Sequence, residues 1–213
     1  MPNQELPAVL GLDAWNRCWS GLGADSMPSD VHARVVASYR EPHRAYHTLQ
    51  HLEECLSLRQ RLDAPCDAPA EIDLALWFHD AVYEPRRDDN EVRSAAWLVD
   101  VATRCGVEER VRERLHRLVM ATCHRAAPQT RDEALLVDVD LSILGAPPER
   151  FAEYEAQVRR EYAWVPEWLY RRKRREILIE FMGRPALYST DACRHLFEAQ
   201  ARRNLERSIA ALA

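Results

Sequence analysis

At its centre the chain reads Ala75-Leu76-Trp77-Phe78-His79-Asp80-Ala81-Val82-Tyr83, an apolar run that contains one adjacent histidine and aspartate. The segment from Ala70 to about Val82 is nearly apolar on all sides, which predicts a helix in the middle of the fold. An imidazole and a carboxylate are costly to bury without partners. A metal ion would compensate both groups at once, so the pair predicts a buried metal site.

Helical spacing of apolar residues continues on both sides of this segment, and no alternating Val/Ile/Thr-rich segment stands out. The expected helices cover residues 8–23, 29–40, 43–62, 70–82, 91–105, 107–123, 132–144, 147–162, 166–182 and 191–212. Gly106 and Gly145 follow two of these segments directly, as glycine often does at helix ends. The pattern predicts an all-α fold of one domain. We expect the tryptophans at helical spacing, Trp15 with Trp19 and Trp164 with Trp168, to lie in its core.

The composition excludes several classes of protein. A net charge of −5 over 213 residues offers no bulk attraction to nucleic acid or to an anionic membrane. The six cysteines are spread singly, which argues against a thiolate zinc site or a disulfide scaffold. No secretory leader or membrane-spanning run is evident. We therefore expect a cytoplasmic protein with reduced thiols, and a homodimer stays open.

Further candidate ligands precede the His-Asp pair. His47 and His51 are four residues apart, so a helix through both would place their imidazoles on one face. His79 and Asp80 would splay by about 100° around their helix, and an ion lying beside it can still contact both.

Asp140 supplies a second carboxylate. It begins an apolar helical run, so its side chain would otherwise be stranded near the core. Asp138 lies two residues earlier, and either carboxylate can be the ligand or a helix cap. Two imidazoles with two carboxylates suit a divalent ion, namely Mn, Mg, Co, Ni, Fe or Zn.

The order of these residues, a histidine, then His-Asp, then a distant aspartate, resembles the signature of the HD superfamily of metal-dependent phosphohydrolases. Tyr46-His47-Thr48-Leu49-Gln50-His51 and Val139-Asp140-Leu141-Ser142 are similar to segments of its phosphodiesterases. The chain is most similar to a bacterial group of uncharacterised predicted HD phosphohydrolases. The motifs that carry this likeness are Arg44–Thr48, Phe78–Tyr83, Asp89–Glu91 with Ser94-Ala95, and Asp140–Gly145.

This resemblance, over roughly residues 30 to 210, implies a fold and a reaction. The fold is a single HD-type helical bundle over residues 1–213, with a motif core at about 30–182 and C-terminal helices at 183–213 packed on it. The reaction is hydrolysis of a phosphate ester by a metal-activated water, with a small nucleotide-like substrate. Neither the length nor a purine-clamping glutamine of the cyclic-nucleotide enzymes is present, so we do not expect a cyclic nucleotide.

The resemblance also implies roles for single residues. The metal ligands are His51, His79, Asp80 and Asp140, with His47 and Asp138 as alternates. His47 falls where the phosphodiesterases place the proton donor to the leaving oxygen, and Asp80 also accepts the proton of the water.

Four further residues are expected beside the metal. Glu91 is assigned to catalysis, and Arg44, Asn90 and His124 are assigned to substrate binding. Asn90 with Glu91 equally suits a helix cap followed by a first-turn acid. His124 equally suits a helix C-terminus.

Two other functions stay open. A di-iron HD-fold oxygenase needs extra histidine ligands, and His124 is the best-placed candidate. A non-catalytic regulatory module would hold its metal without turning over a substrate.

Overall fold

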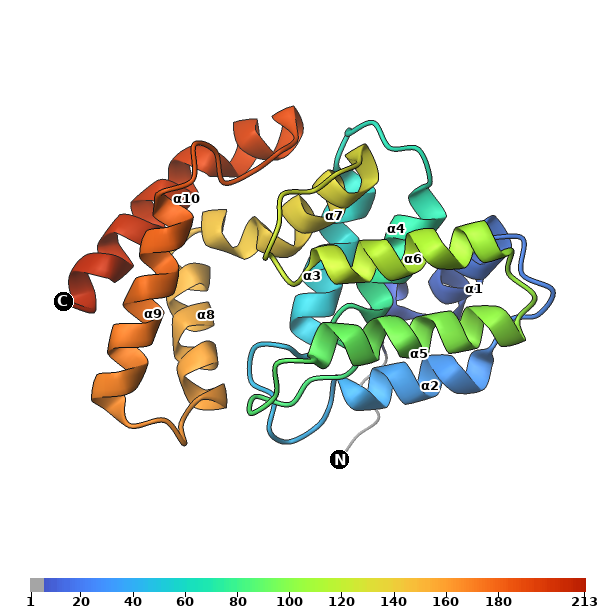
Figure 1. The fold of residues 1–213 in the computed structure, drawn as a ribbon, viewed down its shortest axis with the longest axis horizontal. Coiled ribbons are helices and arrows are strands. Elements are labelled where there is room, and N and C mark those ends of the chain that lie inside the picture. Colours follow the sequence, from blue (N-terminus) through green and yellow to red (C-terminus); the bar gives the residue numbers. More distant parts are fainter. Residues whose placement is uncertain (1–5) are drawn as a thin grey trace.

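The helix that carries the apolar run, α4 (Pro69–Phe78), lies in the middle of the molecule and is buried along most of its length (Figure 1). The computed structural model describes residues 6–213, and within them every regular element is helical. The other helices are α1 (Leu12–Gly21), α2 (Ser29–Ser38), α3 (Leu49–Arg61), α5 (Asn90–Arg104), α6 (Glu109–Ala121), α7 (Arg131–Asp140), α8 (Pro148–Glu161), α9 (Glu167–Met182) and α10 (Asp191–Ala211), with short 3₁₀ helices η1 (Ala8–Leu10) and η2 (Leu141–Gly145). The predicted all-α, single-domain fold is confirmed.

The predicted end of α4 was wrong in a way that matters for the site. The helix ends at Phe78, so His79 and Asp80 lie in the turn that follows it. The carbonyl oxygens of Asp80 and Ala81 accept hydrogen bonds from the Arg44 guanidinium, at 2.7 and 3.2 Å. The predicted helix to Val82 fails because the amides of Asp80 and Val82 donate to the hydroxyls of Tyr39 and Ser94, at 3.3 and 3.0 Å, and not to carbonyls of α4.

The predicted helix over 43–62 also begins later than expected. α3 starts at Leu49, and the Thr48 hydroxyl caps it by accepting a hydrogen bond from the Gln50 amide. The amides of residues 45, 46 and 47 all donate to one carboxylate oxygen of Glu161, at 2.8 to 3.0 Å. His47 therefore lies in a loop, and the prediction that it shares a helix face with His51 was wrong.

Two other segments are interrupted. Residues 8–23 form η1 and α1 with Gly11 between them, and residues 131–145 form α7 followed directly by η2. Gly106, after α5, has a φ of +74°, in the left-handed region that favours glycine.

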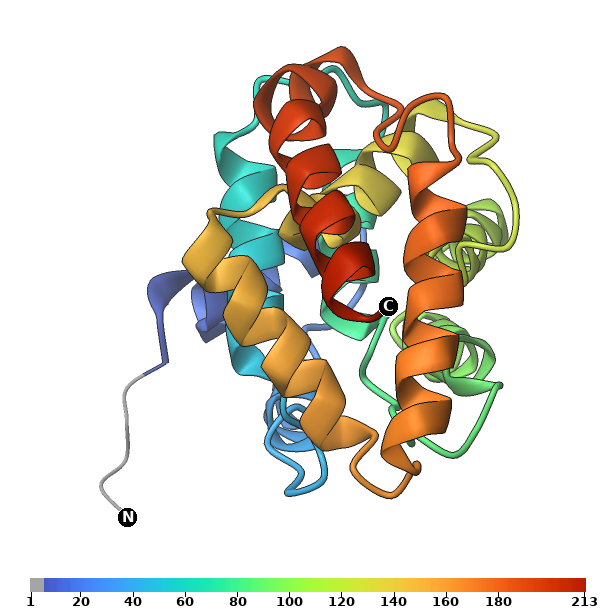
Figure 2. The same cartoon turned by 90° about the vertical axis from the view of Figure 1, so that its left-hand side faces the viewer.

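The core consists of two hydrophobic clusters. The first joins α1 to α7 around fully buried side chains that include Trp15, Trp19 and Trp77. The second joins η2 and α8 to α10, with Leu144 and Tyr188 among its members. The candidate ligands lie where the two meet. Figure 2 turns the α8–α10 layer toward the viewer.

Trp164 and Trp168 are not core residues. Their exposed fractions are 51% and 67%, so the prediction for this second pair was wrong, while Trp15 and Trp19 are fully buried. Both exposed rings lie at or near the turn between α8 and α9. Separately, none of the described helices combines the length and the apolar character that crossing a membrane requires.

Candidate metal centre

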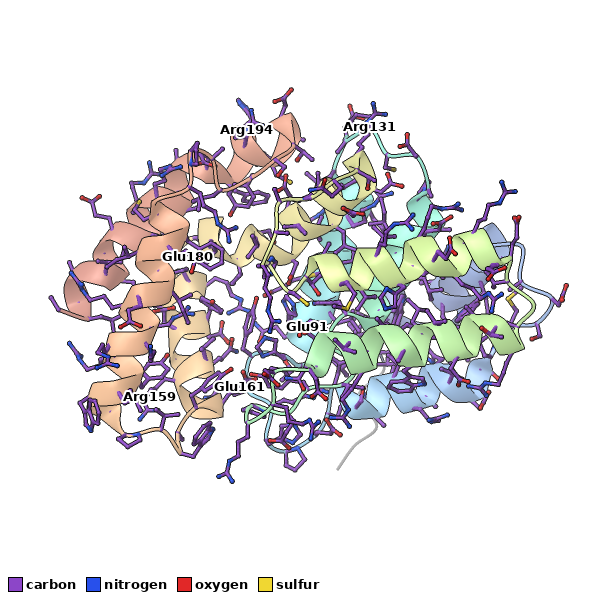
Figure 3. The ribbon with its side chains drawn as sticks, viewed as in Figure 1. Glu91, Arg131, Arg159, Glu161, Glu180 and Arg194 are labelled. Carbon is purple, nitrogen blue, oxygen red and sulfur yellow. The ribbon has the colours of Figure 1, made fainter. Side chains whose placement is uncertain are left out.

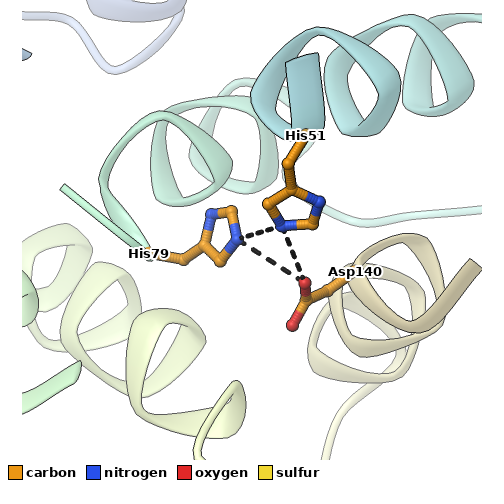
Figure 4. A group of neighbouring side chains, drawn as sticks. All are labelled: His51, His79 and Asp140. Atoms are coloured by element: carbon orange, nitrogen blue, oxygen red, sulfur yellow. Dashed lines mark hydrogen bonds and ion pairs between the residues drawn. The ribbon is translucent and has the colours of Figure 1, made fainter. Parts of the chain in front are cut away.

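Three side chains from three elements converge on one point (Figure 4). His51 comes from α3, His79 from the turn after α4, and Asp140 from the last residue of α7. His51 Nε2 lies 3.1 Å from His79 Nε2 and 3.2 Å from Asp140 Oδ1, and His79 Nε2 lies 3.5 Å from the same oxygen. These atoms are close enough together to hold one metal ion.

The hydrogen-bond partner of His79 Nδ1 determines which nitrogen of that ring can bind a metal ion. His79 Nδ1 lies 2.8 Å from the carbonyl oxygen of Leu76, which can only accept, so Nδ1 is the protonated nitrogen of the neutral ring. Its Nε2 then presents a lone pair to His51 Nε2. A metal ion between these two nitrogens would displace the proton they share and bind the lone pair of each. A backbone carbonyl that fixes the tautomer is the usual partner of a metal-binding histidine.

Asp80 adds a fourth group at the edge of this cluster. Its Oδ2 lies 3.0 Å from His79 Nε2 and 3.5 Å from His51 Nε2. The four predicted ligands are therefore brought together, with two imidazole nitrogens and two carboxylates in reach of one centre. This mixed nitrogen and oxygen set fits a divalent ion but does not select among the metals that accept it.

The pKa shifts of His79 and Asp80 show that imidazoles and carboxylates stabilise each other's charge in this cluster. Burial alone would lower the pKa of His79, but Asp80 and Asp140 raise it well above its usual value. Burial alone would raise the pKa of Asp80, but His79 and His47 hold it well below its usual value. The buried carboxylates thus require positive charge beside them, which either protons on the imidazoles or a divalent cation can supply.

His47 lies beside this centre, although it reaches it from a loop. Its ring centroid is 6.1 Å from that of His51, and it stacks on Tyr83 at 4.0 Å. Its Nδ1 lies 2.8 Å from Glu161 Oε2, which also accepts a hydrogen bond from the Tyr83 hydroxyl at 2.9 Å.

Glu161 is the functional candidate that the sequence reasoning missed. It is the last residue of α8, and its buried carboxylate accepts from three backbone amides, from His47 and from Tyr83. Burial would raise its pKa, but His47 and these amides lower it to about 2. A signal was present, because Glu161 continues the buried register of Phe151, Tyr154 and Val158 along its helix.

His124 also reaches the centre. Its Nε2 lies 3.1 Å from Asp140 Oδ2, and its buried Nδ1 has no hydrogen-bond partner among the residues described. Its φ of +54° is uncommon outside glycine. His124 and Glu91 both line a cavity of about 210 Å³ that also contains Asp80 and Asp140. Figure 3 labels Glu91 at the start of α5, on the side facing α8 and α9.

Arg44 and Asn90 do not face this cavity, contrary to their prediction as substrate-binding residues. The buried guanidinium of Arg44 donates to the carbonyls of residues 47, 80 and 81, so it ties together the loops that carry His47 and Asp80. The Asn90 amide accepts from the Glu84 amide and donates to its carbonyl, each at 3.1 Å, and closes the loop before α5.

Asp138, the alternate to Asp140, points elsewhere. Its carboxylate accepts hydrogen bonds from the amides of Ser189 and Thr190 and from the Thr190 hydroxyl, at 2.7 to 2.8 Å. These donors lie directly before α10. Of the two aspartates, Asp140 is therefore the one at the metal centre.

Comparisons with known proteins do not assign the chain to a family. It matches no model of a known protein family, no curated protein and no solved structure. Its function has to be argued from the site itself.

Proposed function

We propose that this protein is a metal-dependent phosphohydrolase that releases phosphate from a small, nucleotide-like phosphate ester. The observation that carries the proposal is the convergence of His51, His79 and Asp140, with the Nε2 lone pair of His79 directed into the centre. A divalent ion held by these residues and Asp80 would lower the pKa of water and polarise a phosphoryl oxygen.

The pair of His47 and Glu161 supports this reaction class. The Glu161 carboxylate binds Nδ1, so the Nε2 nitrogen of His47 is the one left for a substrate. The fully buried Glu161 carboxylate lies 2.8 Å from Nδ1 and fixes the orientation of the His47 ring. His47 is thus held as a proton donor to the leaving oxygen, which is the role we expect for it from the sequence.

Glu91 and His124 complete the wall around the phosphoryl group. Both line the cavity beside Asp80, and the buried Nδ1 of His124 has no hydrogen-bond partner among the residues described. In this proposal His124 orients the phosphate, Glu91 orients the attacking water, and Asp80 takes up its proton.

One observation favours a second candidate, a di-iron oxygenase. His124 Nε2 lies 3.1 Å from Asp140 Oδ2, whereas His51 lies nearest to Oδ1, so Asp140 and His124 could together hold a second ion. Two irons per chain together with oxygen consumption would support this alternative over hydrolysis.

The experiment that separates these functions is a phosphatase screen on the purified protein after elemental analysis. We expect phosphate release with at least one of Mn, Co, Ni or Mg, and its loss in His79→Ala. The matched control is His116→Ala, an exposed histidine on α6. No phosphate release with any of these metals, or release unaffected by His79→Ala, would contradict the proposal.

A further inference from the structure

A second, larger space adjoins the metal cavity. It is a cleft of about 840 Å³, and Tyr46, His47 and Tyr154 line both spaces. His47 therefore stands at the boundary between the metal centre and the cleft. The buried hydroxyl of Tyr46 at the same boundary has no hydrogen-bond partner among residues 6–213.

One wall of the cleft is apolar and aromatic. It is formed by α8, α9 and the turn between them, and its apolar and aromatic residues beyond Tyr154 include Val158, Tyr162, Trp164, Leu169, Tyr170 and Ile177. The facing wall is the loop at residues 85–88. Ile177 remains 45% exposed, so apolar surface in the cleft is open to solvent.

Most of the basic side chains that line the cleft already have acidic partners. Arg87 pairs with Asp89 at 2.6 Å, Lys173 with Glu176 at 2.8 Å, and Arg174 with Glu155. Arg86 packs over the Trp164 ring, with its Cζ 5.1 Å from the ring centroid. The cleft is therefore suited to a ring more than to a chain of phosphates.

We propose that this cleft binds the leaving alcohol, and that the substrate is a phosphate monoester of an alcohol carrying a planar aromatic ring. The inference rests on the proposed function. In that function His47 protonates the leaving oxygen, so the alcohol must lie on the side of the phosphoryl group where His47 lies. The metal cavity of about 210 Å³ is a quarter of the volume of the cleft, so we assign the phosphoryl group and water to the cavity and a single alcohol to the cleft.

The reaction balances without any further reactant. Water adds to phosphorus, and the bond between phosphorus and the alcohol oxygen breaks with its electron pair on that oxygen. The oxygen takes the proton from His47 Nε2, the proton lost by the water passes to Asp80, and solvent exchange then restores both residues. The products are the free alcohol in the cleft and inorganic phosphate at the metal centre.

The first test compares esters whose alcohols have similar acidity, so that only the ring differs. With the manganese-loaded protein, we expect kcat/KM for 2-naphthylmethyl phosphate to exceed that for ethyl phosphate by roughly tenfold to a hundredfold. Adenosine 5′-monophosphate distinguishes the two sources of a ring. A higher kcat/KM for it than for the naphthyl ester indicates a nucleoside, and a lower one indicates a simple aromatic alcohol.

A matched pair of variants on α9 tests whether the preference for the naphthyl ester arises in the cleft. Ile177 lines the cleft, whereas Ile179 does not, and their exposed fractions are 45% and 44%. Ile177→Trp should fill the cleft and lower kcat/KM for the naphthyl ester by about tenfold while leaving ethyl phosphate nearly unchanged. Ile179→Trp should change neither. Equal rates for the two esters, or equal losses in the two variants, would overturn the proposal.

A binding measurement keeps this test separate from catalysis. Calorimetric titration of the manganese-loaded protein with (2-naphthylmethyl)phosphonate and methylphosphonate needs no turnover. Tighter binding of the naphthyl compound that Ile177→Trp abolishes and Ile179→Trp preserves supports the cleft, even if no ester is hydrolysed and the proposed function fails. Equal affinity for the two phosphonates overturns the cleft, even if ethyl phosphate is hydrolysed.

Discussion

Asp138 and Asp140 are two residues apart in α7, yet their carboxylates lie in opposite kinds of surroundings. The carboxylate of Asp138 accepts from backbone amides and a hydroxyl at the start of α10. That of Asp140 lies within 3.5 Å of imidazole nitrogens from His51, His79 and His124. A carboxylate satisfied by neutral donors needs no ion, whereas one surrounded by imidazoles needs protons or a metal.

The pKa shifts of the two aspartates also differ, since the pKa of Asp138 is raised and that of Asp140 is lowered. Burial raises the pKa of Asp138, and its amide and hydroxyl donors offset this only in part. Burial would raise the pKa of Asp140 too, but His124, His51 and His79 hold it well below its usual value. The comparison predicts a role in stability for Asp138 and a role in metal binding for Asp140.

The largest expected effect follows from removing the metal-facing carboxylate. Asp140→Ala should weaken the affinity for Mn²⁺ or Zn²⁺ by more than about a hundredfold, because a direct ligand matters at least as much as its outer partners. Titration calorimetry on the metal-free protein measures this change. Asp138→Ala is the matched control and should bind the ion with unchanged stoichiometry. Loss of metal in Asp138→Ala alone would reverse the assignment.

A third buried carboxylate, Glu161, combines features of both, since it accepts from backbone amides and from His47. Its pKa is lowered to about 2 from the ordinary value of 4.5, so the unfolded chain binds its proton first as the pH falls. The stability it contributes is present above pH 4.5 and is lost as the pH falls through about 2. That contribution is about 3 kcal/mol.

Unfolding by urea at a series of pH values, for the wild type and for Glu161→Gln, tests this directly. The difference between their unfolding free energies should grow as the pH rises from about 3 to 6. A difference that is independent of pH over this range would show that folding does not shift the pKa of Glu161, and a difference that falls as the pH rises would show that folding raises it.

Replacing Asp138, whose carboxylate accepts from backbone amides, should lower the stability by an amount similar to, or smaller than, that expected from the loss of the Glu161 charge. Asp138→Ala leaves the amides of Ser189 and Thr190 and the Thr190 hydroxyl without their acceptor in a fully buried position. We expect the unfolding free energy to fall by about 2–3 kcal/mol. Urea unfolding of the metal-free protein measures it, with Asp140→Ala as the control. A larger loss of stability in the metal-free Asp140→Ala protein would contradict the comparison.

The smallest expected signal is the number of protons released when the centre binds a metal ion. The pKa of both His51 and His79 is raised well above the ordinary value, so at pH 7 the metal-free centre holds protons that an ion must displace. Titrations in two buffers of different ionisation enthalpy should show release of about one to two protons per ion. Binding without proton release would mean that the imidazoles are already neutral.

The helices could be predicted from the sequence because apolar spacing is a local property. Their ends at the site could not, because partners distant in the chain determine them. The hydroxyls of Tyr39 and Ser94 accept from the amides that would have continued α4, and Glu161 accepts from the amides that would have begun α3 earlier. These partners lie in other elements than the backbone groups they satisfy, and helical periodicity carries no information about them.

The candidate site was predictable to a similar degree. His51, His79, Asp80 and Asp140 do converge, and His47 lies beside them, although the helix expected to bring it there is absent. Arg44 was assigned to a phosphate because an arginine near a metal motif suits an anion, while its actual acceptors are backbone carbonyls. Side-chain type indicates which chemistry a residue can perform, and only the fold shows which partner it meets.

The most direct test of the metal centre is anomalous diffraction from crystals of the protein grown with Mn²⁺. We predict a peak bonded to His51 Nε2, His79 Nε2 and Asp140, with Asp80 beside it and Asp138 still bound to the residues before α10. A manganese peak elsewhere in the molecule, with these three side chains left in mutual contact, would contradict the account.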